Sequence, residues 1–161
     1  MKITILCVGK VKEKYFRDAL EEYAKRLSRY CTFEVLEVAD EMTPDGASKA
    51  TEEQIREKEG MRLLDKLSKM SDPFLITMEI EGRTVSSEQL AKLVSNITVR
   101  GNSHIVFVIG GSLGLSKAVI QRANEHISFS ALTFPHQLMR VILAEQIYRS
   151  FRIINGEPYH K

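Results

Sequence analysis

The residues best suited to chemistry are glycines and an apolar loop in the last third of the chain. Gly110, Gly111 and Gly114 follow a buried strand, and the segment 129–134 (Phe-Ser-Ala-Leu-Thr-Phe) lies just ahead of a helix. Glycine permits positive φ and lets a ligand approach the main chain closely. Two backbone-lined pockets close together are typical of a site for a nucleotide-like cofactor. A plain strand-to-helix turn uses such glycines equally well, so the cluster alone leaves both interpretations open.

Two well-known phosphate-binding motifs do not account for these glycines. The chain has no Gly-x-x-x-x-Gly-Lys-Ser/Thr segment, so a P-loop is unsupported. The 110–114 segment lacks the Gly-x-Gly-x-x-Gly spacing and comes late in the chain, whereas a Rossmann fingerprint follows the first strand of its unit. The 129–134 segment contains no Lys or Arg, which argues against a phosphate-bearing cofactor there.

Alternation of strand-like and helical patterns predicts an α/β fold with a mainly parallel sheet and helices on both faces. The expected strands are 2–9, 33–38, 73–80, 104–109 and 127–130, with a turn at 81–83. The expected helices are 14–29, 51–69, 87–100, 116–124 and 135–151, with Ser48 or Thr51 and Ser86 or Ser87 as candidate N-caps. A length of 161 residues fits a single domain, 1–161.

Composition narrows the functional class. Hydrophobic residues make up 43% and charged residues 27% of the chain, which is ordinary for a globular protein. No apolar run is long enough to span a bilayer. Cys7 and Cys31 have no metal or redox spacing, and the four histidines are too scattered for a metal site. We therefore expect a cytoplasmic protein without a metal cofactor or a membrane partner.

Charge is distributed unevenly although the net charge is only +2. The span 10–29 holds seven basic and four acidic residues, whereas the span 34–59 holds nine acidic and three basic ones. Arg140, Arg149 and Arg152 add positive charge near the C-terminus. If the two basic ends meet in space, they form one positively charged surface that can bind an anionic ligand. Solvated helix faces are the alternative interpretation.

The last helix, 135–151, is apolar over most of its circumference. Such a helix is buried on more than one side. In a small chain one side packs on the sheet, and a C2 dimer is the simplest way to cover the other. A central helix wrapped by its own subunit is the alternative. The apolar side chains concerned are Leu138, Met139, Val141, Ile142, Leu143, Ala144, Ile147, Tyr148 and Phe151.

Five segments carry a close resemblance to one known family. They are Met1–Lys10, Ile109–Ser116, Phe129–Val141, Ala144–Arg149 and Pro158–Lys161. On these segments the chain resembles the bacterial large-subunit ribosomal RNA pseudouridine N3-methyltransferases of the SPOUT class. The match runs end to end at the family's usual length, and the C-terminal motifs together are highly specific.

The resemblance implies a deep trefoil knot in the C-terminal part, one of the rare exceptions to unknotted topology. The knot and the cofactor loops are expected within about residues 104–161. The resemblance also implies a homodimer that binds S-adenosylmethionine in the knot. Its implied substrate is a pseudouridine in a stem-loop of large-subunit ribosomal RNA, on assembled ribosomes. By position, the implied cofactor contacts are Met78, Gly110, Phe129, Ser130, Ala131, Leu132, Thr133 and Phe134. Family members often carry Leu in place of Met78, a volume-conserving difference.

The residues implied for catalysis are His136, Arg140, Tyr159 and His160. The two histidines are candidate bases for the N3 proton, although orientation alone is a sufficient alternative. Arg140 is interpreted as a phosphate contact, as is Arg149, and pairing with Glu145 on the same helix is the alternative. Tyr159 and His160 are interpreted as stacking on the target base rather than as a frayed terminus.

Two rival functions remain at this point. One is a SPOUT methyltransferase that acts on transfer RNA, since such an enzyme shares the cofactor loop. The other is a non-catalytic RNA-binding dimer that has kept the knot. A measurement of cofactor binding separates the second rival from an enzyme.

Overall fold

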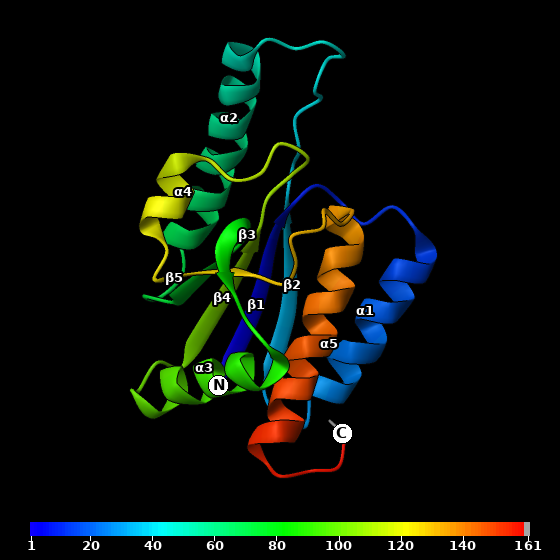
Figure 1. Cartoon of the computed structure of the whole chain (residues 1–161), viewed down its shortest axis with the longest axis vertical. Coiled ribbons are helices and arrows are strands. Elements are labelled where there is room, and N and C mark those ends of the chain that lie inside the picture. Colours follow the sequence, from blue (N-terminus) through cyan, green and yellow to red (C-terminus); the bar gives the residue numbers. More distant parts are fainter. Residues whose placement is uncertain (160–161) are drawn as a thin grey trace.

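A five-stranded parallel sheet forms the centre of the molecule in the computed structural model, which describes residues 1–159 (Figure 1). The strand order is β2-β1-β4-β3-β5. The strands are β1 (Lys2–Val8), β2 (Thr32–Val38), β3 (Phe74–Thr84), β4 (His104–Ile109) and β5 (Glu125–Ser128). Every pairing within the sheet is parallel. The predicted α/β class with a parallel sheet is confirmed.

Helices cover both faces of the sheet, as parallel strands with crossover connections require. The helices are α1 (Lys14–Leu27), α2 (Lys49–Ser68), α3 (Ser87–Val99), α4 (Lys117–Arg122) and α5 (His136–Ile154). One apolar cluster joins α1, α3 and α5 to side chains such as Ile3, Ile5 and Phe107. A second joins α2 and α4 to Leu6 and Val108 on the opposite face. Buried side chains of the strands thus contribute to an apolar cluster on each face of the sheet.

Two helix starts follow the capping signals of the sequence. Ser48 accepts a hydrogen bond from the backbone N–H of Thr51, so Ser48 is the N-cap of α2. Ser86 caps α3 in a reciprocal capping box with Gln89. Each arrangement satisfies backbone donors that the first helical turn leaves open.

The predicted turn at 81–83 is wrong, because β3 continues to Thr84. Ile127 of β5 pairs with Met78 and again with Arg83, with a register irregularity between them. A Cβ atom on Gly82 would lie 2.6 Å from the carbonyl carbon of Ile127. Only glycine permits this close approach, so the irregular segment of β3 lies directly against the backbone of β5.

Helix α5 lies between α1 and α3 on its sheet face (Figure 1). Leu143, Ala144 and Ile147 are completely buried there. Within residues 1–159, no helix is both long enough and apolar enough to cross a membrane.

Candidate active site

A pocket of about 980 Å³ opens at the carboxyl ends of β3, β4 and β5. Ligand sites in open α/β sheets typically lie at this edge. Seven of the eight predicted cofactor contacts line the pocket: Met78, Gly110, Phe129, Ser130, Leu132, Thr133 and Phe134. Ala131 is exposed and is not among the lining residues. The structure therefore brings the glycine turn and the 129–134 loop together around one cavity.

The glycine turn is closed by its own backbone. The N–H of Gly114 donates to the carbonyl of Gly111 at 3.1 Å, and Gly114 has a φ of +83°. A Cβ atom on Gly110 would lie 2.7 Å from the carbonyl carbon of Gly114, so any side chain at Gly110 displaces backbone. The three glycines thus present main-chain groups to the cavity, beside Ser112 and Leu113, which also line it.

This turn also matches the Gly-x-Ser-x-Gly pattern of a nucleophile elbow. That motif needs the serine on a tight strand-to-helix turn. Here Ser112 is exposed within the turn bridged between Gly111 and Gly114, and α4 begins only at Lys117. The pattern therefore does not form an elbow.

The 129–134 loop is shaped by hydroxyl groups. Ser128 donates to the carbonyl of Ser130 at 3.0 Å, and the Ser130 hydroxyl accepts from the N–H of Leu132 at 2.9 Å. These bonds bend the chain, and Leu132, which lines the cavity, is 70% exposed. An apolar loop with exposed backbone groups suits a flat, neutral adenine ring.

Several residues of the pocket wall were not predicted from the sequence. Glu79, Ile80 and Glu81 follow Met78 into the lining, and Arg56 reaches it from α2. The position of Glu79 directly after Met78 was an available signal, whereas the approach of α2 depends on tertiary packing. Glu79 is held by the hydroxyl of Thr77 and by His126, whose Nδ1 lies 2.9 Å from its carboxylate. Two carboxylates and one guanidinium thus supply the charged groups of an otherwise largely apolar wall.

A buried carboxylate of α2 packs against the glycine turn. Glu59 of α2 is only 4% exposed, and burial raises the pKa of its carboxyl. A Cβ atom on Gly111 would lie 2.9 Å from Glu59 Oε2, while Oε1 accepts from the N–H of Glu41 at 3.0 Å. Gly111 is therefore needed for close packing on α2.

His136 lies at the first turn of α5 and lines the pocket. Burial and, after it, the positive charge of Arg140 lower the pKa of this imidazole. A neutral imidazole at pH 7 is the form that accepts a proton. The position and the pKa direction both suit the predicted role as a base.

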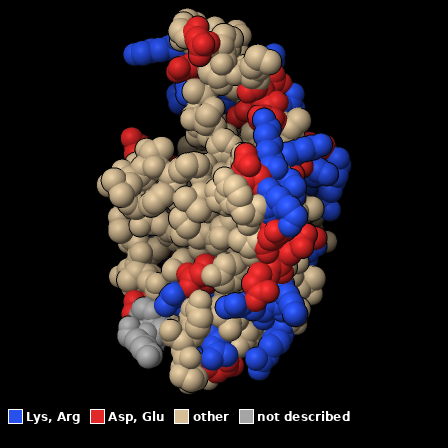
Figure 2. All heavy atoms as spheres, turned by 90° about the vertical axis from the view of Figure 1, so that its right-hand side faces the viewer, with Lys and Arg blue, Asp and Glu red and all other residues tan. Residues whose placement is uncertain are grey.

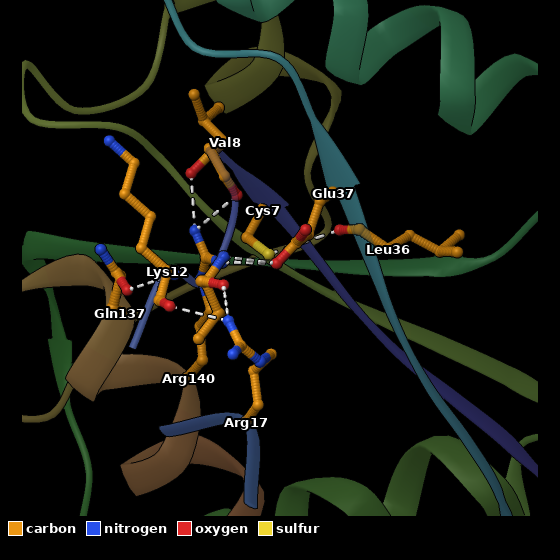
Figure 3. Close-up of polar contacts among 10 residues, drawn as sticks. Cys7, Val8, Lys12, Arg17, Leu36, Glu37, Gln137 and Arg140 are labelled. Carbon is orange, nitrogen blue, oxygen red and sulfur yellow. Dashed lines mark hydrogen bonds and ion pairs between the residues drawn. The ribbon is translucent and has the colours of Figure 1, made fainter. Parts of the chain in front are cut away.

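Arg140 does not lie where the sequence interpretation placed it. Its side chain is fully buried, with one hydrogen bond to Glu37 at 3.0 Å and two to the carbonyls of Val8 and Gly9 at 2.7 and 2.9 Å (Figure 3). The expected phosphate contact does not fit this position, because the guanidinium has no surface to offer. The alternative of pairing with Glu145 is not observed for Arg140 either.

Arg149 does pair with Glu145, at 2.6 Å. Tyr159 joins this pair: its hydroxyl donates to Glu145 Oε1 at 3.1 Å, and the Arg149 guanidinium lies 4.8 Å from its ring centroid. The ring also packs edge-on against Tyr148. Burial and the Glu145 carboxylate raise the pKa of Tyr159 to about 12. Tyr159 is thus docked on α5 outside the pocket lining, and His160 lies outside the described residues.

Comparison with known proteins gives a consistent picture. A family model for predicted SPOUT methyltransferases matches residues 1–160. The chain is 56% identical over 161 residues to the ribosomal RNA large subunit methyltransferase H of Clostridium beijerinckii, covering all of both chains. It is also 56% identical, again over the whole of both chains, to the protein of the same name from Bifidobacterium adolescentis.

A solved structure shares the fold at much lower sequence similarity. The structure of a probable methylase family protein from Haemophilus influenzae matches with a TM-score of 0.54 and 11% identity. The match covers 99% of this chain and 70% of that one.

Proposed function

Because the chain belongs to the SPOUT methyltransferase family, we propose that it methylates N3 of a pseudouridine in large-subunit ribosomal RNA. S-adenosylmethionine supplies an activated methyl group when bound. The full-length identity to relatives named as large-subunit ribosomal RNA methyltransferases carries the substrate proposal. The pocket described above is its site, and the whole chain acts as one domain in the cytoplasm.

The described residues fit this cofactor. The glycine turn folds so tightly that Gly110 lies against the backbone of Gly114 and lines the pocket with main-chain atoms, and the 129–134 loop offers backbone groups beside apolar side chains. Met78, Gly110 and the 129–134 loop would hold S-adenosylmethionine. Methyl transfer from a sulfonium requires mainly alignment of donor and acceptor, which a preformed pocket provides.

The proton on N3 of the target base must be removed. His136 is the residue we propose for this step, since its imidazole lines the pocket and its pKa is lowered. Because Tyr159 is docked on α5 outside the lining of its own subunit's pocket, Tyr159 and His160 would orient a base bound at the pocket of the partner subunit. Arg140 acts indirectly by holding the chain near His136.

We propose that the C-terminal third is knotted. The support is membership of the SPOUT class, for which a knot in the C-terminal part is expected. The segment after β5 then forms the 129–134 loop and α5. A chain threaded in this way fixes the loop around the cofactor.

A homodimer built on α5 completes the proposal. Leu138 and Ile142 lie one turn apart on α5, are half-buried and do not belong to the central apolar cluster. Figure 2 shows a broad area without charged side chains on this side of the molecule. A second copy of the chain covers such a self-complementary apolar face in a C2 dimer.

Transfer of labelled methyl groups in vitro tests the substrate. Purified protein with labelled S-adenosylmethionine should label the large-subunit RNA of ribosomes from a strain that lacks the gene. Transfer RNA from the same strain should remain unlabelled. Labelling of transfer RNA alone would favour the first rival function, and cofactor binding without any methyl transfer would favour the second.

A further inference from the structure

The loop between β1 and α1, residues 9–13, is fixed through its backbone N–H groups. The N–H of Val11 donates to Glu37 Oε1 at 2.9 Å, and that of Lys12 donates to Gln137 Oε1 at 3.0 Å. The N–H of Gly9 donates to the carbonyl of Val38 at 2.8 Å. The loop is thus attached to both β2 and α5.

Two arginines fix carbonyl groups of the same loop and of Val8, the last residue of β1. Arg140 donates to the carbonyls of Val8 and Gly9 from α5. Arg17 of α1 donates to the carbonyls of Val11 and Lys12, at 3.2 and 2.7 Å (Figure 3). A loop held at this many points loses little further backbone entropy when its side chains bind a ligand.

The lysine side chains of the loop lie outside this network. Lys10 and Lys12 are exposed, and within residues 1–159 neither ammonium has a hydrogen-bond or ion-pair partner. Figure 3 shows the Lys12 side chain extending away from the cluster that holds its backbone. The neighbouring cations Arg140 and Lys14 are instead neutralised by Glu37 and Asp18.

The loop lies beside the proposed methyl-transfer site. His136 and Met139 line the pocket, and Gln137 and Arg140 each follow one of them directly in α5. Three carboxylates lie at the loop: Glu37, which accepts from the N–H of Val11 and pairs with Arg140, Glu13 within the loop, and Asp40, which faces Gly9. Among the described residues none of them makes an ion pair with Lys10 or Lys12. A loop with a fixed backbone therefore carries two ammonium groups without ion-pair partners, close in the fold to the residues of α5 that line the pocket.

We propose that Lys10 and Lys12 contact phosphate groups of the RNA substrate, and that Gln137 and Arg140 are positioning residues for them. This inference rests on the proposed function. Phosphate contacts from lysines set the register of a nucleic acid without reading its sequence. Here they would place the target stem so that its base reaches the pocket beside His136.

A double substitution, Lys10→Gln with Lys12→Gln, tests the contact. The matched control is Lys66→Gln with Lys92→Gln, which removes the same charge from exposed lysines on α2 and α3. Binding to purified ribosomes is measured at several salt concentrations, and S-adenosylmethionine binding is measured by calorimetry. The slope of log affinity against log salt should fall by about 0.7–0.9 per lost phosphate contact. The control should keep the wild-type slope, and all variants should keep the cofactor affinity.

Gln137→Ala tests the positioning role, because it removes the acceptor for the Lys12 N–H and leaves both lysines in place. We expect a higher KM for ribosomes with kcat and the salt slope unchanged. A wild-type KM for this variant would exclude the positioning role.

The double variant also separates this inference from the function on which it rests. If wild-type protein methylates ribosomes and the double variant retains its salt slope, the inference is overturned while the proposed function stands. If wild-type protein neither binds nor methylates ribosomes, both are overturned.

Discussion

Gly110 is the residue at which a single added methyl group has the clearest consequence. In Gly110→Ala the new Cβ would lie 2.7 Å from the backbone of Gly114, so the turn must move. We expect cofactor affinity to fall about tenfold or more, equivalent to ~1.4 kcal/mol. Calorimetry with S-adenosylmethionine measures this. Gly46→Ala is the control for backbone strain away from the pocket, because Gly46 has a φ of +69° but an added Cβ there meets nothing within 4 Å. Unchanged affinity in a folded Gly110→Ala protein would remove the glycine turn from the site.

His136 provides a test by titration. Burial and Arg140 lower its pKa, so its NMR titration midpoint should lie below the ordinary value of about 6.5. The unfolded chain then binds more protons between the two pKa values. The neutral His136 imidazole therefore contributes to the free energy of unfolding above about pH 6.5, and this contribution is lost as the pH falls through the folded-state pKa. A His136→Gln spectrum assigns the signal, and a midpoint above the ordinary value would contradict the assignment of a neutral base.

At the residue scale, apolar loops and glycines were predictable and buried ion pairs were not. The pocket residues follow strand ends in the sequence, so their type and position indicate a site. Arg140 looked like a surface cation of an RNA-binding helix. Only the folded chain brings Glu37 and the end of β1 close enough to bury its guanidinium.

At the scale of elements, two adjacent residues of α5 allow the stability of the fold and the dimer contact to be tested separately. Leu143 is completely buried in its own subunit, whereas Ile142 is half-buried outside the central cluster. Leu143→Ala should destabilise the fold by about 2–5 kcal/mol. Ile142→Glu should leave the fold intact and dissociate the dimer, because the dimer would bury an unpaired charge. Denaturant unfolding and light scattering measure the two effects, and a monomeric wild type at micromolar concentration would refute the dimer.

The C-terminal segment provides a second test of an element. Deletion of residues 158–161 leaves the contacts of Glu157 with Arg152 and Tyr30 in place. The truncated protein should therefore fold and bind cofactor. Methyl transfer to ribosomes should fall a hundredfold or more, because the deletion removes residues that position the target base. Full activity after truncation would show that the segment has no part in the reaction.

Element boundaries show where local sequence signals are sufficient. Ser48 and Ser86 were recognisable caps because hydroxyl side chains satisfy open helix donors. The end of β3 was not recognisable, since Glu81-Gly82-Arg83 reads locally as a turn. Its pairing with Ile127 is a long-range contact that no local pattern encodes.

At the scale of the whole molecule, the α/β class follows from alternating patterns, but the strand order and the convergence of charges do not. The basic ends do meet, since α5 packs on α1. However, Arg140, Arg149 and Arg152 are paired there with Glu37, Glu145 and Glu157. The positively charged surface expected from the two ends thereby loses these three charges, and it retains exposed cations of the span 10–29 such as Lys10, Lys12 and Lys25.

Mass spectrometry of ribosomal RNA tests the central claim most directly. Large-subunit RNA is compared between the parent strain, a strain that lacks the gene and the same strain carrying the gene on a plasmid. The account predicts that one pseudouridine loses a single methyl group in the deletion strain and regains it with the plasmid. An unchanged large-subunit RNA, with a methyl group lost from a transfer RNA instead, would contradict the account.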